Sequence, residues 1–461
     1  MKTLLVKPYN LTDHIQPSLG LGYLATAIRN KSDVRILDCI KERVEIEQLG
    51  EIIKNYKPDL VGFQCYTFDL RFLKDALNIV KNYDEKIITV MGGPHPSAVP
   101  QQTMEYFGNK LDFAFKGEAE KSFSLFVDYL NGEKINFSDI PGFVWRKNGT
   151  IESNDCYFEN NLDSLGMLSW DLIHPEQYPE SQHGAFYKKF PIAPIMITRG
   201  CPYQCTFCAG KLVSGVKLRK RGIKEVINEI DMLYKDYGIR EFHVIDDNFT
   251  LDVAYAKTFL RELIVKNLDI SWSTPNGVRM DMLDKELLAL MKQSGLYLIS
   301  LGIESGSDRI LKLMKKNLTV EKIRKSIALI KSCGIDIAGF FILGFPGEKK
   351  EEIMDTINLS LELDLIRANF FTYLPFPGTE SYSELAKNGE LERVNWDRFY
   401  FMNSAYTPIG ISRKELKRLH RIAFLRFYAR PKILWKNILS IKSLRHLLFL
   451  TKRFYHWIVM S

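Results

Sequence analysis

The sequence predicts an α/β protein with two parallel-sheet domains followed by a basic helical tail. Two stretches, residues 1–135 and 193–375, alternate short apolar runs with amphipathic segments, which is the pattern of βα units. Residues 411–461 carry 13 Lys and Arg against one acid, whereas the rest of the chain carries 50 against 54. The excess positive charge therefore belongs to the tail and not to the predicted α/β body.

Residues 1–135 contain five predicted strands that alternate with helices. The strands are expected at Lys2–Lys7, Val34–Asp38, Leu60–Gln64, Ile87–Met91 and Asp112–Phe115. The helices are expected at Gly20–Asn30, Ile46–Tyr56, Arg71–Asn82 and Glu120–Leu130. This order predicts an open, doubly wound, Rossmann-like sheet with right-handed crossovers. Ligands of such sheets bind beyond the carboxyl ends of the strands.

Residues 136–192 read as a linker with a hairpin around the turn Lys147–Thr150, and Trp145, Trp170 and Tyr178 are expected to pack there. Six further strands are predicted at Pro194–Thr198, Glu241–Ile245, Ile270–Thr274, Tyr297–Gly302, Asp336–Leu343 and Arg367–Thr372. Helices are expected at 220–236, 252–267, 284–293, 319–332 and 350–363. Six units are too few for a complete eight-unit barrel, and the chemistry of parallel barrels lies at the carboxyl ends of their strands.

The composition excludes several classes of protein. The N-terminal apolar run is too short for a signal peptide, and no run of 18 apolar residues predicts a transmembrane helix. Seven cysteines without an export signal indicate a reducing cytoplasm and metal ligation rather than disulfides. Four of them are expected to be ordinary thiols: Cys39, Cys65, Cys156 and Cys333.

The other three, Cys201, Cys205 and Cys208, form a C-x3-C-x2-C loop directly after the apolar run Ile195–Thr198. Three thiolates on one loop can hold three irons of a four-iron cube and leave the fourth iron open to a chelating molecule. A structural zinc site would need a fourth Cys or His nearby, and none follows before His243. The pattern therefore favours a [4Fe-4S] cluster over zinc, a disulfide or unrelated core thiols.

The segment Arg199–Cys208, including Phe207, resembles the cluster motif of the radical S-adenosylmethionine (SAM) superfamily. The resemblance implies an open, partial (βα)6 barrel over residues 193–405. It also implies that the SAM amino and carboxylate groups chelate the open iron. One-electron cleavage of the C–S bond would then give a 5′-deoxyadenosyl radical that abstracts hydrogen.

Later strand ends also resemble SAM-contacting segments of this superfamily. Asp246–Thr250 could accept hydroxyl groups or merely cap the next helix, and Gly302–Ser307 could bind the ribose or form a plain turn. Arg279 could pair with the SAM carboxylate through a bidentate fork or lie on the surface. Leu374–Thr379 is expected to border the substrate. The predicted SAM residues are Tyr203, Phe207, Asp247, Arg279, Glu304, Ser305, Gly344, Pro346 and Gly347.

Residues 1–135 resemble the cobalamin-binding domain that precedes many radical SAM enzymes, through Pro17–Ala25, Gly92–His95 and Lys116–Glu118. The D-x-H-x-x-G signature that supplies a cobalt-ligating histidine is absent, because Asp13-His14 does not fit its spacing. The alternative is a Rossmann-like domain whose glycines serve only turns. The predicted cobalamin residues are Pro17, Leu19, Gly20, Tyr66, Thr67, Gly92, Gly93, His95, Gly117 and Glu118.

The tail, within residues 406–461, interleaves basic residues with large apolar ones. Such helices can lie in an anionic membrane surface or pack across the barrel with their basic residues exposed. Nucleic-acid binding is not expected, because no recognition module accompanies the charge. The apolar residues are Leu416, Leu419, Phe424, Phe427, Trp435, Ile438, Leu439, Leu444, Leu447, Leu448, Phe454 and Trp457.

Together these features predict a cobalamin-dependent radical SAM enzyme that functionalises an unactivated carbon, by C-methylation of a hydrophobic small molecule or lipid. One alternative is a radical cyclase or oxidoreductase without methyl transfer, similar to the anaerobic branch that acts on porphyrin esters. Another is a non-catalytic cobalamin- or cluster-binding sensor. The expected partners are the substrate and an external low-potential donor of the flavodoxin or ferredoxin type, in the cytoplasm or at the inner membrane face.

Overall fold

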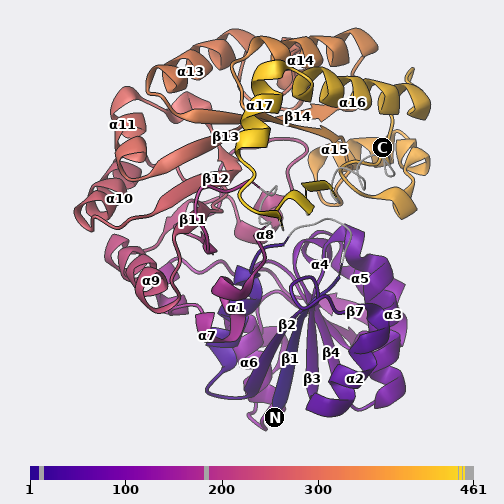
Figure 1. Ribbon diagram of the computed structural model, residues 1–461. Helices are drawn as coiled ribbons and strands as arrows, with labels where there is room; N and C mark the ends of the chain where they lie inside the picture. Colours follow the sequence, from indigo (N-terminus) through magenta and orange to yellow (C-terminus); the bar gives the residue numbers. More distant parts are fainter. Residues whose placement is uncertain (10–14, 181–185, 445, 449, 452–461) are drawn as a thin grey trace. The chain divides into compact units, whose positions relative to one another are not determined.

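The computed structural model describes residues 1–9, 15–180, 186–444, 446–448 and 450–451 (Figure 1). The chain forms two compact units. The first unit comprises Met1–Pro179, Gly200–Pro202 and Ala209–Gly222. The second unit comprises Glu180–Arg199, Tyr203–Cys208 and Ile223–Ser461. The predicted positions Asp13, His14, Phe454 and Trp457 lie outside the described residues.

The first unit is built on a seven-stranded sheet in the order β2-β1-β3-β4-β5-β6-β7. Its first five strands run parallel and confirm the predicted doubly wound sheet: β1 (Lys2–Lys7), β2 (Asp33–Asp38), β3 (Leu60–Gln64), β4 (Ile88–Gly92) and β5 (Phe113–Phe115). The hairpin β6 (Phe143–Lys147) and β7 (Thr150–Ser153) pairs antiparallel to β5. The hairpin assigned to the linker therefore extends this sheet and covers the edge that β5 would otherwise expose.

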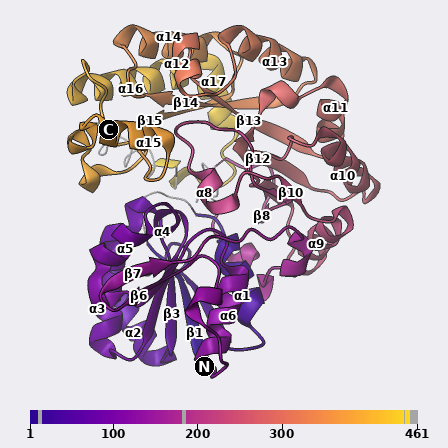
Figure 2. The same cartoon turned by 180° about the vertical axis from the view of Figure 1, so that it is seen from behind.

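Apolar side chains alternate along the parallel strands and build one core on each face of this sheet. On one face lie α2 (Ile46–Tyr56), α3 (Leu70–Tyr83) and α5 (Pro100–Phe107). On the other face, α1 (Leu19–Ile28) and α6 (Glu120–Leu130) lie side by side (Figure 2). Short helices complete the unit at α4 (Pro94–Ala98), α7 (Trp170–Ile173) and α8 (Gly210–Ser214). Trp145, Trp170 and Tyr178 are buried, as expected for packing residues.

The second unit contains a six-stranded parallel sheet in the order β15-β14-β13-β12-β11-β8. Its strands are β8 (Ile192–Ile195), β11 (Glu241–Val244), β12 (Ser271–Val278), β13 (Leu296–Glu304), β14 (Asp336–Leu343) and β15 (Arg367–Thr372). The helices between them are α9 (Ile223–Asp236), α10 (Val253–Val265), α11 (Lys285–Gln293), α12 (Asp308–Leu313), α13 (Val320–Ser332) and α14 (Lys350–Glu362). This strand order and alternation confirm the partial (βα)6 barrel.

Two further short strands, β9 (Thr198–Arg199) and β10 (Arg219–Lys220), flank the cysteine loop in the sequence. The single strand predicted over Pro194–Thr198 is therefore divided into β8 and β9. The helix α15 (Glu380–Lys387) follows the sixth strand of the barrel.

The tail begins with α16 (Arg413–Tyr428), which packs against β15 and α14. Its Phe427 is fully buried and its ring centroid lies 6.1 Å from that of Phe370 on β15. The imidazole of His420, also buried, lies 2.8 Å from the Phe370 carbonyl oxygen. This half of the tail therefore packs across the barrel, as one of the two alternatives expected.

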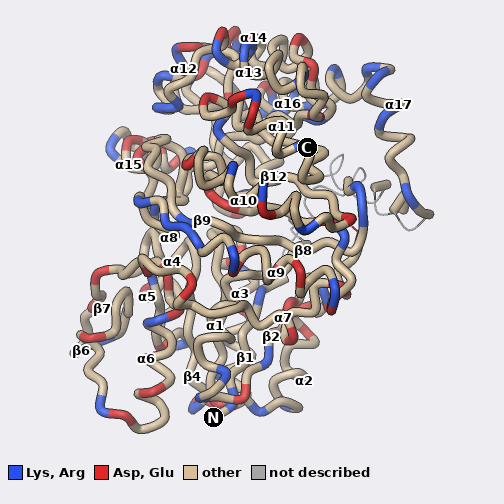
Figure 3. The backbone as a smooth tube through the Cα atoms, turned by 90° about the vertical axis from the view of Figure 1, so that its left-hand side faces the viewer, with Lys and Arg blue, Asp and Glu red and all other residues tan. Residues whose placement is uncertain are grey.

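The next helix, α17 (Pro431–Leu439), buries only Ile433. It carries Lys432 and Lys436 without acidic residues (Figure 3), and Trp435 on it is 64% exposed. No helix among the described residues is long and apolar enough to cross a membrane.

Two alanine variants test whether α16 packs across the barrel or lies on a membrane surface. Phe427 is fully buried, whereas Leu425 on the same helix is 54% exposed. Phe427→Ala should lower the free energy of unfolding by about 3–5 kcal/mol because it leaves a cavity beneath the helix. Leu425→Ala should change it by less than about 0.5 kcal/mol. Equilibrium urea unfolding measures both effects, and equal losses would show that α16 does not pack on β15 as described.

Candidate functional site

Asp246, which follows β11, holds the residues that lead into the cysteine loop. Its carboxylate accepts hydrogen bonds from the backbone amides of Ile197 and Thr198, each at 2.7 Å, and from the Thr198 hydroxyl at 2.8 Å. Burial raises the pKa of Asp246 to about 7, although these donors oppose the shift. The capping alternative does not describe Asp246 or Asp247, because Asp252 caps α10 by accepting from the Tyr255 amide. The neighbouring Asp247 is exposed.

Thr206 ties the middle of the cysteine loop to two later helices. Its amide donates to the carbonyl oxygen of Met314 at the end of α12 (3.1 Å). Its own carbonyl oxygen accepts from the amide and hydroxyl of Ser381 in α15 (3.0 and 2.9 Å). Thr206 is buried, whereas Cys205 is half-buried and Cys208 exposed. The backbone of the loop is thus fixed while its thiols stay accessible.

Gly200 precedes the first cysteine and allows a close backbone contact. Its φ is +91°, and a Cβ there would lie 2.3 Å from the carbonyl oxygen of Lys217. The Cys201 amide donates to the Gly215 carbonyl oxygen at 3.2 Å. Only glycine combines this backbone conformation with this approach. The position of Cys201 therefore depends on the absence of a side chain at residue 200.

Two buried cations lie close to the cysteine loop. The guanidinium of Arg279 lies 3.7 Å from the Tyr203 ring centroid, and the Lys316 ammonium lies 6.0 Å from that of Phe207. Burial lowers the pKa of Lys316, but Glu304 and the nearby Cys205 more than offset this and raise it. Positive charges beside a cysteine stabilise its thiolate, which is the form that binds iron.

Arg279 is 8% exposed and is therefore not a surface residue. Its Nε and Nη2 atoms donate to the two carboxylate oxygens of Asp281 at 2.9 and 2.8 Å. The bidentate pair predicted between Arg279 and the SAM carboxylate is thus made instead with Asp281 of the protein. The remaining nitrogen, Nη1, is buried and has no hydrogen-bond partner among the described residues. A buried donor without an acceptor is costly, so Nη1 fits an incoming anion such as the carboxylate of SAM.

Glu304, at the end of β13, has a strained backbone and a buried ion pair. Its φ of +66° is uncommon for a residue with a side chain, and such strain is typical of functional sites. Its Oε1 accepts from Lys316 at 2.8 Å. A Cβ on Gly302 would lie 2.4 Å from that oxygen and 2.6 Å from the Lys316 nitrogen, so glycine leaves the room for this pair. Oε2 accepts no hydrogen bond from the described residues and remains for a ligand.

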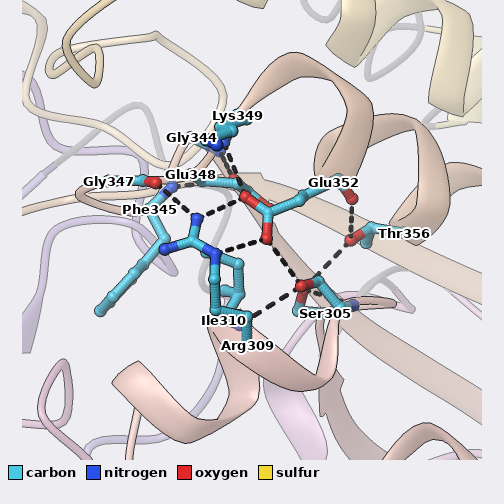
Figure 4. A network of polar contacts seen from close by, with 11 residues as sticks. Ser305, Arg309, Ile310, Gly344, Phe345, Gly347, Glu348, Lys349, Glu352 and Thr356 are labelled. Atoms are coloured by element: carbon cyan, nitrogen blue, oxygen red, sulfur yellow. Dashed lines mark hydrogen bonds and ion pairs between the residues drawn. The ribbon is translucent and has the colours of Figure 1, made fainter.

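Ser305 takes part in an internal network that ties the end of β13 to α14 (Figure 4). Its hydroxyl is fully buried, lies 3.2 Å from that of Thr356 and accepts from the Ser307 amide at 3.1 Å. Glu352 joins this network by accepting from Arg309 and from the Ser307 hydroxyl. The Arg309 hydrogen bond, with other donors, lowers the pKa of Glu352 to about 2. The predicted SAM contact Ser305 thus faces the protein interior.

The turn after β14 approaches the tail helix α16 closely at one end and is open at the other. A Cβ on Gly344 (φ +78°) would lie 2.8 Å from Leu416 on α16, whereas Gly347 has open space around it and Pro346 is half-buried. Glu348 braces the turn, because its Oε2 accepts from the amides of Gly344 (2.6 Å) and Phe345 (3.0 Å). Its Oε1 is buried without a partner among the described residues, and burial raises the pKa of Glu348 to about 8.

In the first unit, the ends of β3 and β4 bring several predicted cobalamin residues together. Thr67 and His95 are both buried, with 3.1 Å between the hydroxyl oxygen and Nδ1. Burial lowers the pKa of His95 to about 4, so its imidazole is neutral. A Cβ on Gly93 (φ +111°) would lie 3.0 Å from the carbonyl oxygen of Cys65, which also accepts from the His95 amide. Tyr66 is 37% exposed beside them.

The remaining rim residues of this unit divide between open and occupied positions. Gly20 is exposed with open space where a Cβ would lie, while Pro17 and Leu19 are buried and Gly92 is half-buried. The amide of Gly117 (φ +71°) donates to the Ser97 hydroxyl at 2.9 Å.

The carboxylate of Glu118 already has a partner within the protein. It forms a buried bidentate ion pair with Arg219, with both hydrogen bonds at 2.7 Å. This predicted cobalamin residue anchors the segment that follows the cysteine loop. Sequence reasoning missed Arg219, because a single arginine 101 residues away carries no local signal.

Comparison with known proteins identifies the family. A model of the radical SAM superfamily matches residues 195–360, and a model of the B12 binding domain matches residues 12–127. An uncharacterized methyltransferase of Pyrococcus horikoshii is 31% identical over 95% of this chain and 95% of its own length. This chain belongs to the B12-binding radical SAM family. Membership implies an enzyme whose cofactors are a [4Fe-4S] cluster, SAM and cobalamin.

Two further relatives show the range of this family. Cytidylyl-2-hydroxyethylphosphonate methyltransferase of Streptomyces wedmorensis is 29% identical over 84% of this chain and 82% of its own. The anaerobic magnesium-protoporphyrin IX monomethyl ester cyclase of Rubrivivax gelatinosus is 25% identical, with coverage of 87% and 71%.

The two-domain fold recurs in solved structures. TsrM of Kitasatospora setae, solved with cobalamin and a [4Fe-4S] cluster, matches 91% of this chain and 85% of its own with a TM-score of 0.70 and 20% identity. OxsB, solved with aqua-cobalamin and SAM, matches 100% of this chain and 72% of its own with a TM-score of 0.74 and 15% identity. These similarities establish the fold.

The residues of this chain fit the implied cluster. Among the described residues, no three His, Cys, Asp or Glu side chains gather around one point as ligands of a single metal ion. A four-iron cube takes its thiolates on separate irons, so it needs three cysteines spread over a loop, which Cys201, Cys205 and Cys208 provide.

The role of Gly200 is tested by Gly200→Ala, with Gly238→Ala as its control. Gly238 also has a positive φ (+67°), but nothing lies within 4 Å of a Cβ there. The control should cost about 1–2 kcal/mol from backbone strain alone and should keep its iron. Gly200→Ala adds the clash with Lys217, so most of the iron bound on anaerobic reconstitution should be lost. Equal iron contents in the two variants would contradict this account.

Proposed function

We propose that this protein is a cobalamin-dependent radical SAM enzyme that methylates an unactivated carbon of a hydrophobic small molecule or lipid. The observation that carries the proposal is the environment of the cysteine loop. There, accessible thiols lie beside two buried cations, and one of these, Arg279, keeps a buried nitrogen without a partner among the described residues. Methyltransferases among the relatives supply the reaction class.

Each segment of the chain has a role in the proposed function. Residues 1–135 bind cobalamin, 136–192 link the domains, 193–405 form the radical SAM barrel and 406–461 form the tail. Cys201, Cys205 and Cys208 hold the cluster. When bound, the cofactors supply a reductively generated adenosyl radical for hydrogen abstraction and a methyl group for transfer.

The chain's own residues orient SAM. Arg279 donates from Nη1 to its carboxylate, and the free carboxylate oxygen of Glu304 accepts from its amino or ribose hydroxyl groups. Tyr203 is already stacked beneath the Arg279 guanidinium, so the aromatic ring restricts the direction of that donor. Gly347, exposed and surrounded by open space, lets a flat group such as adenine approach the backbone.

Cobalamin contacts are assigned to the open rim of the first unit. Gly20 has no neighbour within 4 Å of a Cβ, and Tyr66 beside Gly92 and Gly93 offers an exposed ring. Because His95 is neutral and buried, with Thr67 fixing its ring, it can act as a hydrogen-bonding group. Glu118 contributes by holding Arg219.

Two partners complete the proposal. A low-potential flavodoxin or ferredoxin supplies the electron for SAM cleavage. Exposed apolar residues on and after α17 support peripheral contact with a membrane, where a lipid substrate would be met: Leu434, Trp435, Ile438, Leu439, Leu444, Leu447 and Leu448. The two lysines of α17 do not carry this argument, because they pair with Asp364 and Asp336 of the barrel. A second candidate reaction, radical cyclisation without methyl transfer, is supported by the similarity to the anaerobic cyclase.

Methionine with a deuterated methyl group distinguishes the two reactions in cells. Cells producing the wild-type protein should accumulate a product with a labelled methyl, because methyl transfer keeps all its deuterium. Cys201→Ala, Cys205→Ala and Cys208→Ala should each abolish this product, whereas Cys333→Ala, outside the loop, should not. Mass spectrometry of extracts and assay of 5′-deoxyadenosine from purified protein provide the readouts. Formation of 5′-deoxyadenosine without any labelled product would favour cyclisation, and failure to form it would refute the radical assignment.

A further inference from the structure

The strand β15 divides its side chains between two faces of the barrel sheet. Ala368, Phe370 and Thr372 are buried, and Phe370 contacts Phe427 on α16. The alternate residues are accessible: Arg367 and Phe371 are half-buried and Asn369 is exposed. Because α16 covers Ala368 and Phe370, the alternate residues lie on the inner face of the barrel sheet.

The neighbouring strand β14 continues this inner face. In the parallel register Phe340 pairs with Asn369 and Ile342 with Phe371, and both are half-buried. The ring centroids of Phe340 and Phe371 lie 6.0 Å apart, and Phe401 adds a third ring 5.4 Å from Phe371. The aromatic part of the inner face thus lies toward the carboxyl ends of the strands, which is the end that carries the chemistry of parallel barrels.

Arg367 begins β15 at the opposite end of this face. Its guanidinium lies 4.5 Å from the Phe186 ring centroid and makes no hydrogen bond or ion pair with the described residues. Burial lowers the pKa of this guanidinium. A partly desolvated guanidinium whose donors lack a hydrogen-bond acceptor is unfavourable unless a ligand supplies one.

The two carboxylates whose charges act on Arg367, those of Glu241 and Asp336, already have other hydrogen-bond donors. Glu241 accepts from the Tyr297 hydroxyl at 2.7 Å and from the backbone amides of Lys188 and Lys189. Asp336 accepts from Lys436 through both of its oxygens, each at 2.8 Å. No hydrogen bond joins either carboxylate to the guanidinium, so the donor fork of Arg367 stays available for a ligand.

We propose that this inner face binds the substrate, with Arg367 holding an oxyanion and Phe340 and Phe371 packing against the apolar body. This inference rests on the proposed function and adds the substrate class: an elongated amphipathic molecule with a carboxylate or phosphate at one end. Arginine binds both oxyanions through two parallel hydrogen bonds. Arg367 and Phe371 lie four residues apart on the inner face, about 13 Å at about 3.3 Å per residue. That spacing sets the distance between the oxyanion and the part of the apolar body that packs on Phe371.

Three probes with the same six-carbon chain test the proposal: 6-phenylhexyl phosphate, 6-phenylhexanoate and 6-phenylhexanol. Their affinities for the cluster- and cobalamin-reconstituted protein are measured by isothermal titration calorimetry. The wild type should bind at least one anion about 10-fold or more tighter than the alcohol, as expected for a charge-assisted bidentate pair. Which anion binds tighter assigns the oxyanion as phosphate or carboxylate.

Substitutions test whether Arg367 causes the preference for the anionic probes over the alcohol. Arg367→Met should bring the anion and the alcohol to within about twofold, and Arg367→Lys should keep part of the difference. Arg324→Met is the matched control, because Arg324 is exposed and pairs with Glu362 on the surface, and it should bind as the wild type does. Phe371→Ala should weaken all three probes by a similar factor, because it removes apolar contact only.

The proposal is overturned if the alcohol binds as tightly as both anions, if none of the probes binds, or if Arg367→Met keeps the preference. The same wild-type samples are assayed for cobalamin absorbance and for 5′-deoxyadenosine formed from SAM without substrate. Loss of those two signals would contradict the proposed function. Normal signals without an oxyanion preference would contradict this inference alone.

Discussion

The three hydrogen bonds that Asp246 accepts are the constraint on which the site depends. A loop that carries three accessible thiols cannot join a strand ladder, so its backbone groups must be satisfied by other means. Asp246 fixes the residues before the loop, and Thr206 fixes its middle through Met314 and Ser381. Glycine at position 200 then admits the tight contact that precedes Cys201. The backbone of the loop is thus held in place while its cysteines stay accessible.

Charge completes this arrangement. Burying Arg279 and Lys316 costs free energy that Asp281 and Glu304 offset only in part, since Nη1 of Arg279 still lacks a partner among the described residues. Thiolate sulfurs and the carboxylate of SAM would supply the missing negative charge. The strained backbone of Glu304 and the space left by Gly302 also keep positive charge near the cysteine loop, because both allow the ion pair with Lys316. The residues around the cysteine loop are therefore arranged for anionic ligands.

Sequence alone predicted the features that depend on local spacing, and it missed those that depend on distant partners. Periodicity identified the parallel strands of both sheets, and cysteine spacing identified the loop. The partners of Asp246 lie 48 and 49 residues away and that of Glu118 lies 101 away, so no local pattern reveals them. The inward-facing hydroxyl of Ser305 depends on Thr356 in the same way. Which residues are the accessible cysteines and which are the buried side chains that hold the loop could be told only in three dimensions.

Mössbauer spectroscopy of protein reconstituted with ⁵⁷Fe tests the central claim, that three cysteines hold a four-iron cluster and leave one iron for SAM. Without SAM, the spectrum should show a [4Fe-4S] cluster. Addition of SAM should shift the signal of one iron in four, because only that iron gains nitrogen and oxygen ligands. A spectrum that SAM leaves unchanged, or one that shows isolated iron or a two-iron cluster, would contradict the account.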